Sequence, residues 1–490
     1  MIRQIAPSQT FTPTSPVENR YESQPSRLTL DLPLVLFAEA VILVLSCFVW
    51  WFANGLDQVM SGIAAVSIGS LLIIGWFAVR HIAEIECYGF LILKAALTYW
   101  YLVPMLLAGS RGEILLDGQH RDFTPDQIAK TCVAVMLTNF ASTLVYQLVA
   151  APPVLNLTRL SNWFNGRRYQ APLIAIGVQL ALGLAPFLFS DRGLITTILG
   201  SRSAGGIFPK SNLGGSGGSA YALTFFLTSC CLLAFYGSLV RPGGLVKWTS
   251  LLFALAALLV SAFALSTRSM LLASVMPALT LYLLGSTDRW RFIKVGACLA
   301  GLWFGADLLV STRDQGFVQS VDKHMRVSRN LVDNDYFSEL VFEVATIPDQ
   351  VRYSYEDPTV FALLAFIPRA LWHSKPVQQQ AEVVMRLRTN LLTEELTGNM
   401  LPGIAGQYWE EMGWPGLILL GVWLGGLSAV CDHLLVLCNW TVRYLVFTYL
   451  WALFISFRAF ALSTFLPAAL CAIAILLLSR PEHEDNAHRH

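Results

Sequence analysis

Long apolar segments follow one another along this chain, and they constrain its fold more than any other feature. A helix that crosses the hydrocarbon core of a bilayer needs about 17–25 mainly apolar residues. We predict twelve such spans, of which the eighth, eleventh and twelfth are short. They cover residues 32–53, 58–79, 88–107, 128–150, 171–189, 220–240, 247–265, 269–285, 293–310, 415–437, 442–457 and 461–478. The sequence therefore predicts an all-α, polytopic integral membrane protein with about 12 transmembrane helices.

The scarcity of charge excludes most other classes of protein. Only 13% of the 490 residues are Asp, Glu, Lys or Arg, against about 25% in soluble globular proteins. A mean hydropathy of +0.56 agrees with this. Such a chain has too few charges to cover a water-facing surface, which excludes an ordinary soluble enzyme. A net charge of +1 provides no global field for nucleic acid, so no nucleic-acid partner is expected.

The distribution of Lys and Arg between short loops predicts the orientation. If the N-terminus is cytoplasmic, the inner segments carry 15 of these residues and the short outer loops carry 7. Cytoplasmic loops are normally the ones enriched in Lys and Arg. We therefore expect both termini inside and one long outer segment, residues 311–414.

This orientation divides the chain into five regions. The first 31 residues are rich in Pro, Ser and Thr and resemble a disordered cytoplasmic tail. Residues 32–310 hold helices one to nine, 415–478 hold helices ten to twelve, and 479–490 form a second cytoplasmic tail. A structureless connection of about a hundred residues would be unusual, so 311–414 is expected to be a partly helical folded cap.

The nine cysteines lack the CxxC or Cys/His spacing of common zinc and redox sites. Most fall inside apolar runs, where a thiol behaves as a small hydrophobic side chain. We therefore predict no metal site and no cofactor.

Two ionisable residues lie inside predicted spans, where charge is costly. Glu39 and Lys94 lie at similar depths in the first and third spans, which would allow them to neutralise each other. A structural ion pair is the expected role.

Arginines gather at the outer ends of the predicted helices. Arg268 lies in a tight turn between spans seven and eight, and Arg458 lies between spans eleven and twelve. Asp307 ends span nine, with Arg313 just beyond it. Any one of these could anchor to lipid headgroups. Together they favour a binding site for an anionic group, because the guanidinium fork matches phosphate oxygens.

Two motifs stand out in the long outer segment. Residues 366–376, FIPRALWHSKP, place Arg369, His373 and Lys375 close together between two prolines. Residues 397–416 are rich in glycine, which permits close backbone approach, and contain the adjacent carboxylates Glu410 and Glu411. One of these carboxylates is expected to be structural and the other to face a site.

With these motifs, the chain resembles the Wzy-type polymerases of O-antigen and exopolysaccharide repeat units. The resemblance rests on Ser-Thr-Arg-Ser at 266–269, on the PRALWHSKP segment, and on the glycine-rich stretch 398–416. The motifs that carry the resemblance lie within residues 260–430. The remainder of the chain resembles the family only in its topology. It implies a bacterial inner-membrane enzyme with a periplasmic active face.

The resemblance implies metal-independent glycosyl transfer between undecaprenyl-diphosphate-linked glycans, which are both donor and acceptor. A chain-length regulator protein is a further implied partner. Arginine and lysine would stabilise the leaving diphosphate in place of a divalent ion. The implied diphosphate ligands are Arg268, Arg369, Arg458, Lys375 and Arg313. The candidates for a general base are Glu410, His373 and Asp307.

Three alternatives remain open from the sequence. An O-antigen ligase-type glycosyltransferase would use the same chemistry with a second acceptor. A flippase or transporter of lipid-linked sugar would carry charges along a path through the membrane. A structural partner of a polysaccharide assembly machine would need no site at all.

Overall fold

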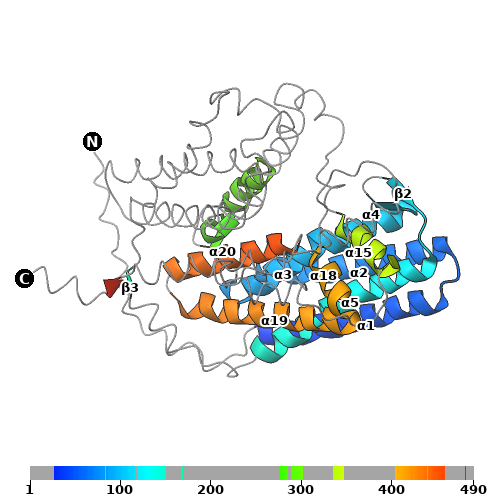
Figure 1. Cartoon of the computed structure of the whole chain (residues 1–490). Coiled ribbons are helices and arrows are strands. Elements are labelled where there is room, and N and C mark those ends of the chain that lie inside the picture. Colours follow the sequence, from blue (N-terminus) through cyan, green and yellow to red (C-terminus); the bar gives the residue numbers. More distant parts are fainter. Residues whose placement is uncertain are drawn as a thin grey trace, which may run out of the picture.

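A computed structural model of the protein describes residues 27–82, 84–116, 119–150, 167–168, 276–277, 279–284, 289–301, 335–346, 403–438, 440–457 and 480–481. These residues are almost entirely helical (Figure 1). The helices are α1 (Arg27–Phe52), α2 (Leu56–His81), η2 (Ile85–Cys87), α3 (Tyr88–Leu97), η3 (Thr98–Leu102), α4 (Val103–Arg111), α5 (Pro125–Ala150), α15 (Tyr336–Thr346), α18 (Gly403–Met412), α19 (Trp414–Leu437) and α20 (Trp440–Ser456).

Five of the described helices are long and apolar enough to cross a membrane. They are α1 from Asp31, α2, the continuous stretch Ile85–Arg111, α5 and α19. They coincide with the first four predicted spans and the tenth, and α20 coincides with the eleventh, 442–457. The described part is therefore that of an α-helical membrane protein, as predicted. Spans 171–189, 220–240, 247–265 and 461–478, and about half of 269–285 and of 293–310, lie outside the described residues.

One boundary differs from the prediction. The N-terminal tail was expected to run to residue 31, but α1 already begins at Arg27. The side chain of Asp31 contacts Arg80 and His81 at the end of α2. The helix therefore includes residues 27–31, which were assigned to the tail, and Asp31 connects it to the end of α2.

The long helices define two ends of a bundle. Trp50 near the end of α1 donates a hydrogen bond from Nε1 to Asp126 at the start of α5, 2.8 Å away. Its ring lies 6.0 Å from that of Trp414, where α19 begins. We call this the Glu410 end. At the opposite end, which we call the His81 end, Asp432 of α19 accepts hydrogen bonds from the backbone of Gly89 and Phe90 at the start of α3.

Glycines allow the central helices to approach closely. Gly421 and Gly425 of α19 form a small-xxx-small stripe against α5. A Cβ at Gly421 would lie 2.6 Å from the Cβ of Ala141, and one at Gly425 would lie 2.2 Å from the carbonyl oxygen of Ser142. Helices in a bilayer associate by such close packing, since lipid supplies no hydrophobic driving force. The pair α5–α19 forms the most extensive helix contact among the described elements.

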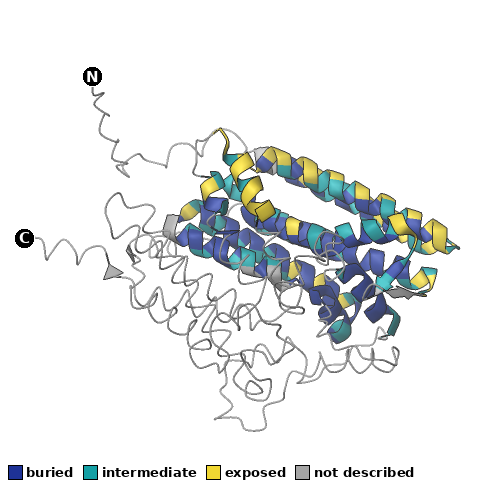
Figure 2. Cartoon of the chain, turned by 90° about the horizontal axis from the view of Figure 1, so that it is seen from above, coloured by how far each residue is buried: buried dark blue, intermediate teal, exposed yellow. Residues whose placement is uncertain are grey.

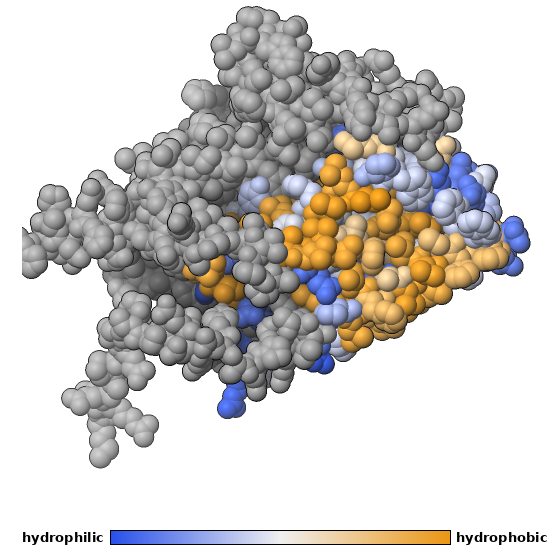
Figure 3. Space-filling view, turned by 90° about the horizontal axis from the view of Figure 1, so that it is seen from below, coloured by the Kyte–Doolittle hydropathy of each residue, from blue (hydrophilic) through white to orange (hydrophobic). Residues whose placement is uncertain are grey.

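The two outermost helices present an apolar surface. Large exposed hydrophobic side chains run along α1 and α2, including Phe37, Phe48, Leu72 and Val79. Exposed residues line the outer sides of helices at the edge of the described bundle (Figure 2), and a broad hydrophobic face covers part of its surface (Figure 3). Such a surface is expected where a protein contacts lipid.

Shorter elements cover the Glu410 end. Strands β1 (Ile114–Leu116) and β2 (Gln119–Arg121) form an antiparallel hairpin after α4. Helix α15 lies within the expected cap, 311–414, and α18 lies near the end of it. The rest of the expected cap lies largely outside the described residues.

A second antiparallel contact joins β3 (Arg167–Arg168) to β4 (Arg480–Pro481).

Candidate functional site

Glu410 is the one predicted site residue that the described part of the chain contains. It lies on α18, immediately before α19 enters the bundle. The other predicted site residues lie outside the described residues: Asp307, His373, Arg268, Arg369, Arg458, Lys375 and Arg313. The candidate site is therefore built outward from Glu410.

The N-terminus of α18 is attached to two helices of the bundle. The backbone N–H of Ala405 donates a hydrogen bond to the Tyr101 hydroxyl, 3.0 Å away, and that of Ile404 donates to the carbonyl of Phe457, 3.1 Å away. Gly403 has a φ of +67°, and a Cβ there would lie 2.8 Å from the Tyr101 hydroxyl. Tyr101 belongs to η3, a single π-helical turn of the kind often found at functional sites. These contacts satisfy N–H groups that a helix N-terminus leaves unpaired.

A glycine also sets the other end of α18. Gly413 has a φ of +61°, a left-handed conformation that favours glycine, and its N–H bonds to the carbonyl of Trp409 at 2.8 Å. The chain then turns directly into α19. Both ends of the short helix are thus held, so the position of Glu410 is fixed by the bundle.

Helix α15 brings a second glutamate to α18. Glu343 is fully buried, and neither of its carboxylate oxygens has a hydrogen-bond partner among the described residues. Its side chain lies against Gly406, where a Cβ would lie only 1.7 Å from Glu343 Oε2. Glu410 is four residues beyond Gly406, hence on the same face of α18. The charge of Glu410 acts on Glu343, and we call these two residues the carboxyl pair.

The environment of the pair favours a proton on Glu343. Burial, and secondly the charge of Glu410, raises the pKa of Glu343 well above its ordinary value. Glu410 is only partly buried, whereas the adjacent Glu411 is 2% exposed. Two carboxyls in unlike environments can divide the roles of proton holder and base.

Aromatic and basic side chains surround this end. The Lys130 ammonium lies 5.1 Å from the centre of the Trp409 ring, which packs edge-on against Trp414 at 5.3 Å. Together with Trp50, these rings form an aromatic cluster at the Glu410 end of the bundle.

A separate polar cluster lies in the middle of the bundle and confirms the predicted neutralising pair. Lys94 Nζ is 2.9 Å from Glu39 Oε1, and both side chains are 2% exposed. The ammonium also donates to Asn139 Oδ1 and to Thr143 Oγ1, each at 2.6 Å. Thr143 in turn donates to the second oxygen of Glu39. This cluster joins α1, α3 and α5, and its charges are paired and enclosed.

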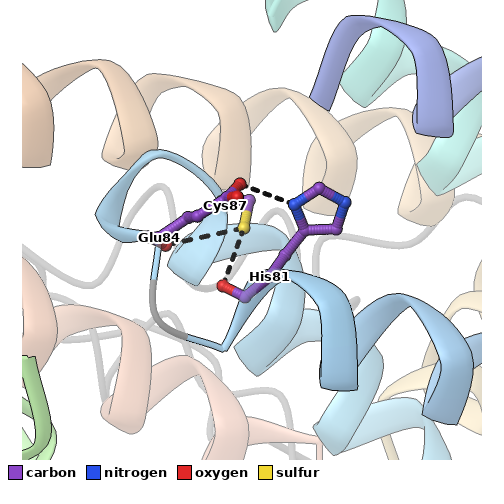
Figure 4. A group of neighbouring side chains, drawn as sticks. All are labelled: His81, Glu84 and Cys87. Carbon is purple, nitrogen blue, oxygen red and sulfur yellow. Dashed lines mark hydrogen bonds and ion pairs between the residues drawn. The ribbon is translucent and has the colours of Figure 1, made fainter. Parts of the chain in front are cut away.

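A third group at the His81 end has the chemistry of metal ligands. His81, Glu84 and Cys87 each offer one ligand atom, and these atoms all lie within 4.8 Å of one another. The Cys87 thiol also donates to the backbone carbonyls of His81 and Glu84 (Figure 4). His81 Nδ1 is 2.6 Å from Glu84 Oε2, and His81 Nε2 is 3.0 Å from Asp31 Oδ2.

Sequence reasoning missed both Glu343 and this third group. Glu343 lies in a short helical stretch with nothing local to distinguish it from a surface glutamate. The His81 group did leave a signal, His-x-x-Glu-x-x-Cys, but it spans the end of one helix and the start of another rather than one regular element.

Comparison with protein-family models, with curated proteins and with solved structures gave no match to this chain.

Proposed function

We propose that this protein is a glycosyltransferase that polymerises undecaprenyl-diphosphate-linked repeat units on the periplasmic face of the bacterial inner membrane. The observation that carries the proposal is the Glu343–Glu410 carboxyl pair, held at one end of a bundle of membrane helices. The sequence resemblance supplies the substrate class, and the carboxyl pair supplies a base for it.

The reaction needs one proton acceptor. A hydroxyl of the incoming lipid-linked unit attacks the anomeric carbon of the growing glycan, and the bond from that carbon to the diphosphate oxygen breaks. The bonding electrons leave with the diphosphate, and the hydroxyl proton passes to the base. Glu410 suits this role because it is only partly buried, while a protonated Glu343 behind it adds no second negative charge.

The position of the pair also suits substrates anchored in lipid. Both substrates keep their prenyl chains in the bilayer, so their diphosphates and first sugars lie at headgroup level. The start of the membrane-spanning helix α19 at Trp414, shortly after Glu410 and Glu411, supports such a position for the pair. The predicted diphosphate ligands Arg268, Arg369, Arg458, Lys375 and Arg313 would neutralise the leaving group there.

Glu410→Gln tests the proposal. Proteoliposomes would receive lipid-linked repeat units extracted from cells that make the protein, and the product would be followed as a glycan ladder. A general base contributes about 10²–10⁴-fold to a rate, so Glu410→Gln should reduce polymerisation by at least about 100-fold. Glu410→Asp should retain part of the activity.

Asp57→Asn is the matched control. Asp57 is an exposed carboxylate in the first turn of α2, at the same end of the bundle. Its variant should polymerise at the wild-type rate. Equal rates for Glu410→Gln and wild type, at equal amounts of folded protein, would exclude Glu410 as the base.

Two other functions give different results in the same assay. A ligase would leave lipid-linked units unpolymerised until a lipid A-core acceptor is added. A flippase would move a fluorescent lipid-linked sugar across the bilayer without lengthening it. The enclosure of the Lys94–Glu39 pair favours an enzyme over a transporter, because a transport path would expose such charges.

A further inference from the structure

We propose that His81, Glu84 and Cys87 bind one Zn²⁺ ion where α2 ends and α3 begins. Imidazole, carboxylate and thiolate are all ligands that zinc accepts. Two of the three side chains are inaccessible, since His81 and Cys87 are both 0% exposed. The group is therefore enclosed by the fold rather than assembled by chance on a surface.

The spacing of the donor atoms is close to what the ion needs. Tetrahedral zinc, with ligand distances of about 2.0–2.3 Å, separates its ligand atoms by about 3.3–3.6 Å. The three donor atoms lie within 4.8 Å of one another, and His81 Nδ1 and Glu84 Oε2 are now 2.6 Å apart. Shifts of about an ångström would admit the ion. Glu84 has the freedom for such a shift, because its side chain is 35% exposed.

Asp31 supports the histidine as a second-layer partner. Its Oδ2 lies 3.0 Å from His81 Nε2, and it also pairs with Arg80 at 2.8 Å. A histidine that binds zinc through one nitrogen commonly donates its other N–H to a carboxylate, which fixes the tautomer and the ring orientation. With the Nε2 proton held by Asp31, loss of the Nδ1 proton on metal binding would turn a lone pair toward Glu84 and Cys87 (Figure 4).

Charge balance also favours a divalent ion in this position. A Cys87 thiolate and the Glu84 carboxylate together neutralise Zn²⁺, which lowers the cost of burying it. On binding, the thiol proton and any proton on His81 Nδ1 leave to water. A water molecule would be the fourth ligand.

This site is independent of the proposed glycosyl transfer. It lies at the far end of α2 from the Glu410 end, and 26 residues of helix span about 39 Å. The ion would instead join the end of α2 to η2, where the chain turns back into the bundle.

Metal binding to the purified full-length protein tests the proposal. After removal of bound metal with EDTA, the detergent-solubilised protein would be titrated with Zn²⁺ alone, and bound zinc measured by mass spectrometry. We expect one ion per chain. Titration with Co²⁺ alone should give a thiolate-to-cobalt charge-transfer band, which requires Cys87 as a ligand and which a merely structural cysteine would not produce.

Matched variants assign the ligands. Cys87→Ser and His81→Gln should abolish stoichiometric zinc binding, and Asp31→Asn should weaken it about 10–100-fold. Cys438→Ser and Glu86→Gln should bind zinc as the wild type does. Cys438 is a buried cysteine at the same end of the bundle, and Glu86 is the acidic neighbour outside the group.

Three results would overturn the proposal: no zinc bound by the wild type, no charge-transfer band with cobalt, or undiminished binding in folded Cys87→Ser. Circular dichroism and elution volume would establish folding of each variant. If His81→Gln does not fold, the cobalt band of the wild type and its loss in Cys87→Ser still decide the outcome.

Discussion

Two buried glutamates of this protein, Glu39 and Glu343, lie in opposite electrostatic environments. Glu39 in the middle of the bundle contacts the Lys94 ammonium at 2.9 Å and accepts a hydrogen bond from Thr143. Glu343 at the Glu410 end has no hydrogen-bond partner among the described residues and lies near a second carboxylate. Both are at most 3% exposed, so burial alone does not distinguish them.

The difference separates a structural charge from a candidate functional one. A buried ion needs partners, and a helix bundle supplies them wherever the charge serves only to hold helices together. A buried carboxyl without a cation holds its proton instead, which makes it useful for chemistry with protons. The Lys94–Glu39 pair thus belongs to the scaffold, and the Glu343–Glu410 pair belongs to the proposed site.

Breaking the structural pair should have the largest effect on stability. Lys94→Met leaves the Glu39 carboxylate buried without its cation, and removal of one partner of a buried pair costs about 3–5 kcal/mol. The midpoint of thermal unfolding in detergent measures the loss. Lys130→Met is the control, because Lys130 is only partly buried at the rim of the bundle, and it should cost less than about 1 kcal/mol.

A double variant sharpens the same result. Lys94→Met combined with Glu39→Gln removes both charges, so it should unfold at a higher temperature than Lys94→Met alone. If the loss of stability in the double variant equalled the sum of the losses in Lys94→Met and Glu39→Gln, the two charges would not stabilise each other.

Filling the space beside Glu343 should have an intermediate effect. Gly406→Ala adds a Cβ that would lie 1.7 Å from Glu343 Oε2. The carboxylate ends a flexible side chain but is fully enclosed, so its displacement requires repacking and should cost about 1–3 kcal/mol.

Gly75→Ala is the matched control for this helix substitution, because a Cβ at Gly75 meets nothing within 4 Å. It should be neutral or stabilising by up to about 1 kcal/mol. Chemical denaturation followed by tryptophan fluorescence compares the two variants. Equal stability of Gly406→Ala and Gly75→Ala would contradict the close contact between Glu343 and α18.

The smallest expected effect is a change in pH dependence. The pKa of Glu343 is raised in the folded protein, mainly by burial. A carboxyl with a raised folded pKa contributes its stability below the unfolded pKa and loses it as the pH rises through the folded pKa. The unfolding midpoint of the wild type should therefore decrease as the pH rises above the pKa of an unfolded glutamate, and that of Glu343→Gln should decrease less. Identical profiles would show that Glu343 is ionised with little cost.

The helical architecture of the described part was predictable from the sequence. Hydrophobic segments long enough to cross a bilayer locate α1, α2, α3–α4, α5, α19 and α20, because each must satisfy its own backbone hydrogen bonds within the membrane. The Lys94–Glu39 pair was predictable from the same hydrophobic segments. Two opposite charges at the same depth in a membrane have few other partners. The start of α1 at Arg27 was missed because the polar and charged residues Arg27, Thr29 and Asp31 fall outside the apolar segment.

Of the candidate sites, the sequence indicated Glu410 but not its neighbours. The glycines in the stretch 398–416 indicated that another part of the chain approaches this backbone closely, but not which part. The structure shows that the Glu343 carboxylate approaches Gly406. The His-x-x-Glu-x-x-Cys pattern became a metal-ligand group only where the turn after α2 brought the three side chains together.

The sequence by itself thus determined which segments enter the membrane and which charges they carry, because hydropathy acts on each segment separately. Only the tertiary structure decided which charges meet, since the rotation of each helix about its axis is set by packing against its neighbours. Helix packing brought Glu39 against Lys94, whereas it placed Glu343 near the carboxylate of Glu410 and, among the described residues, near no cation.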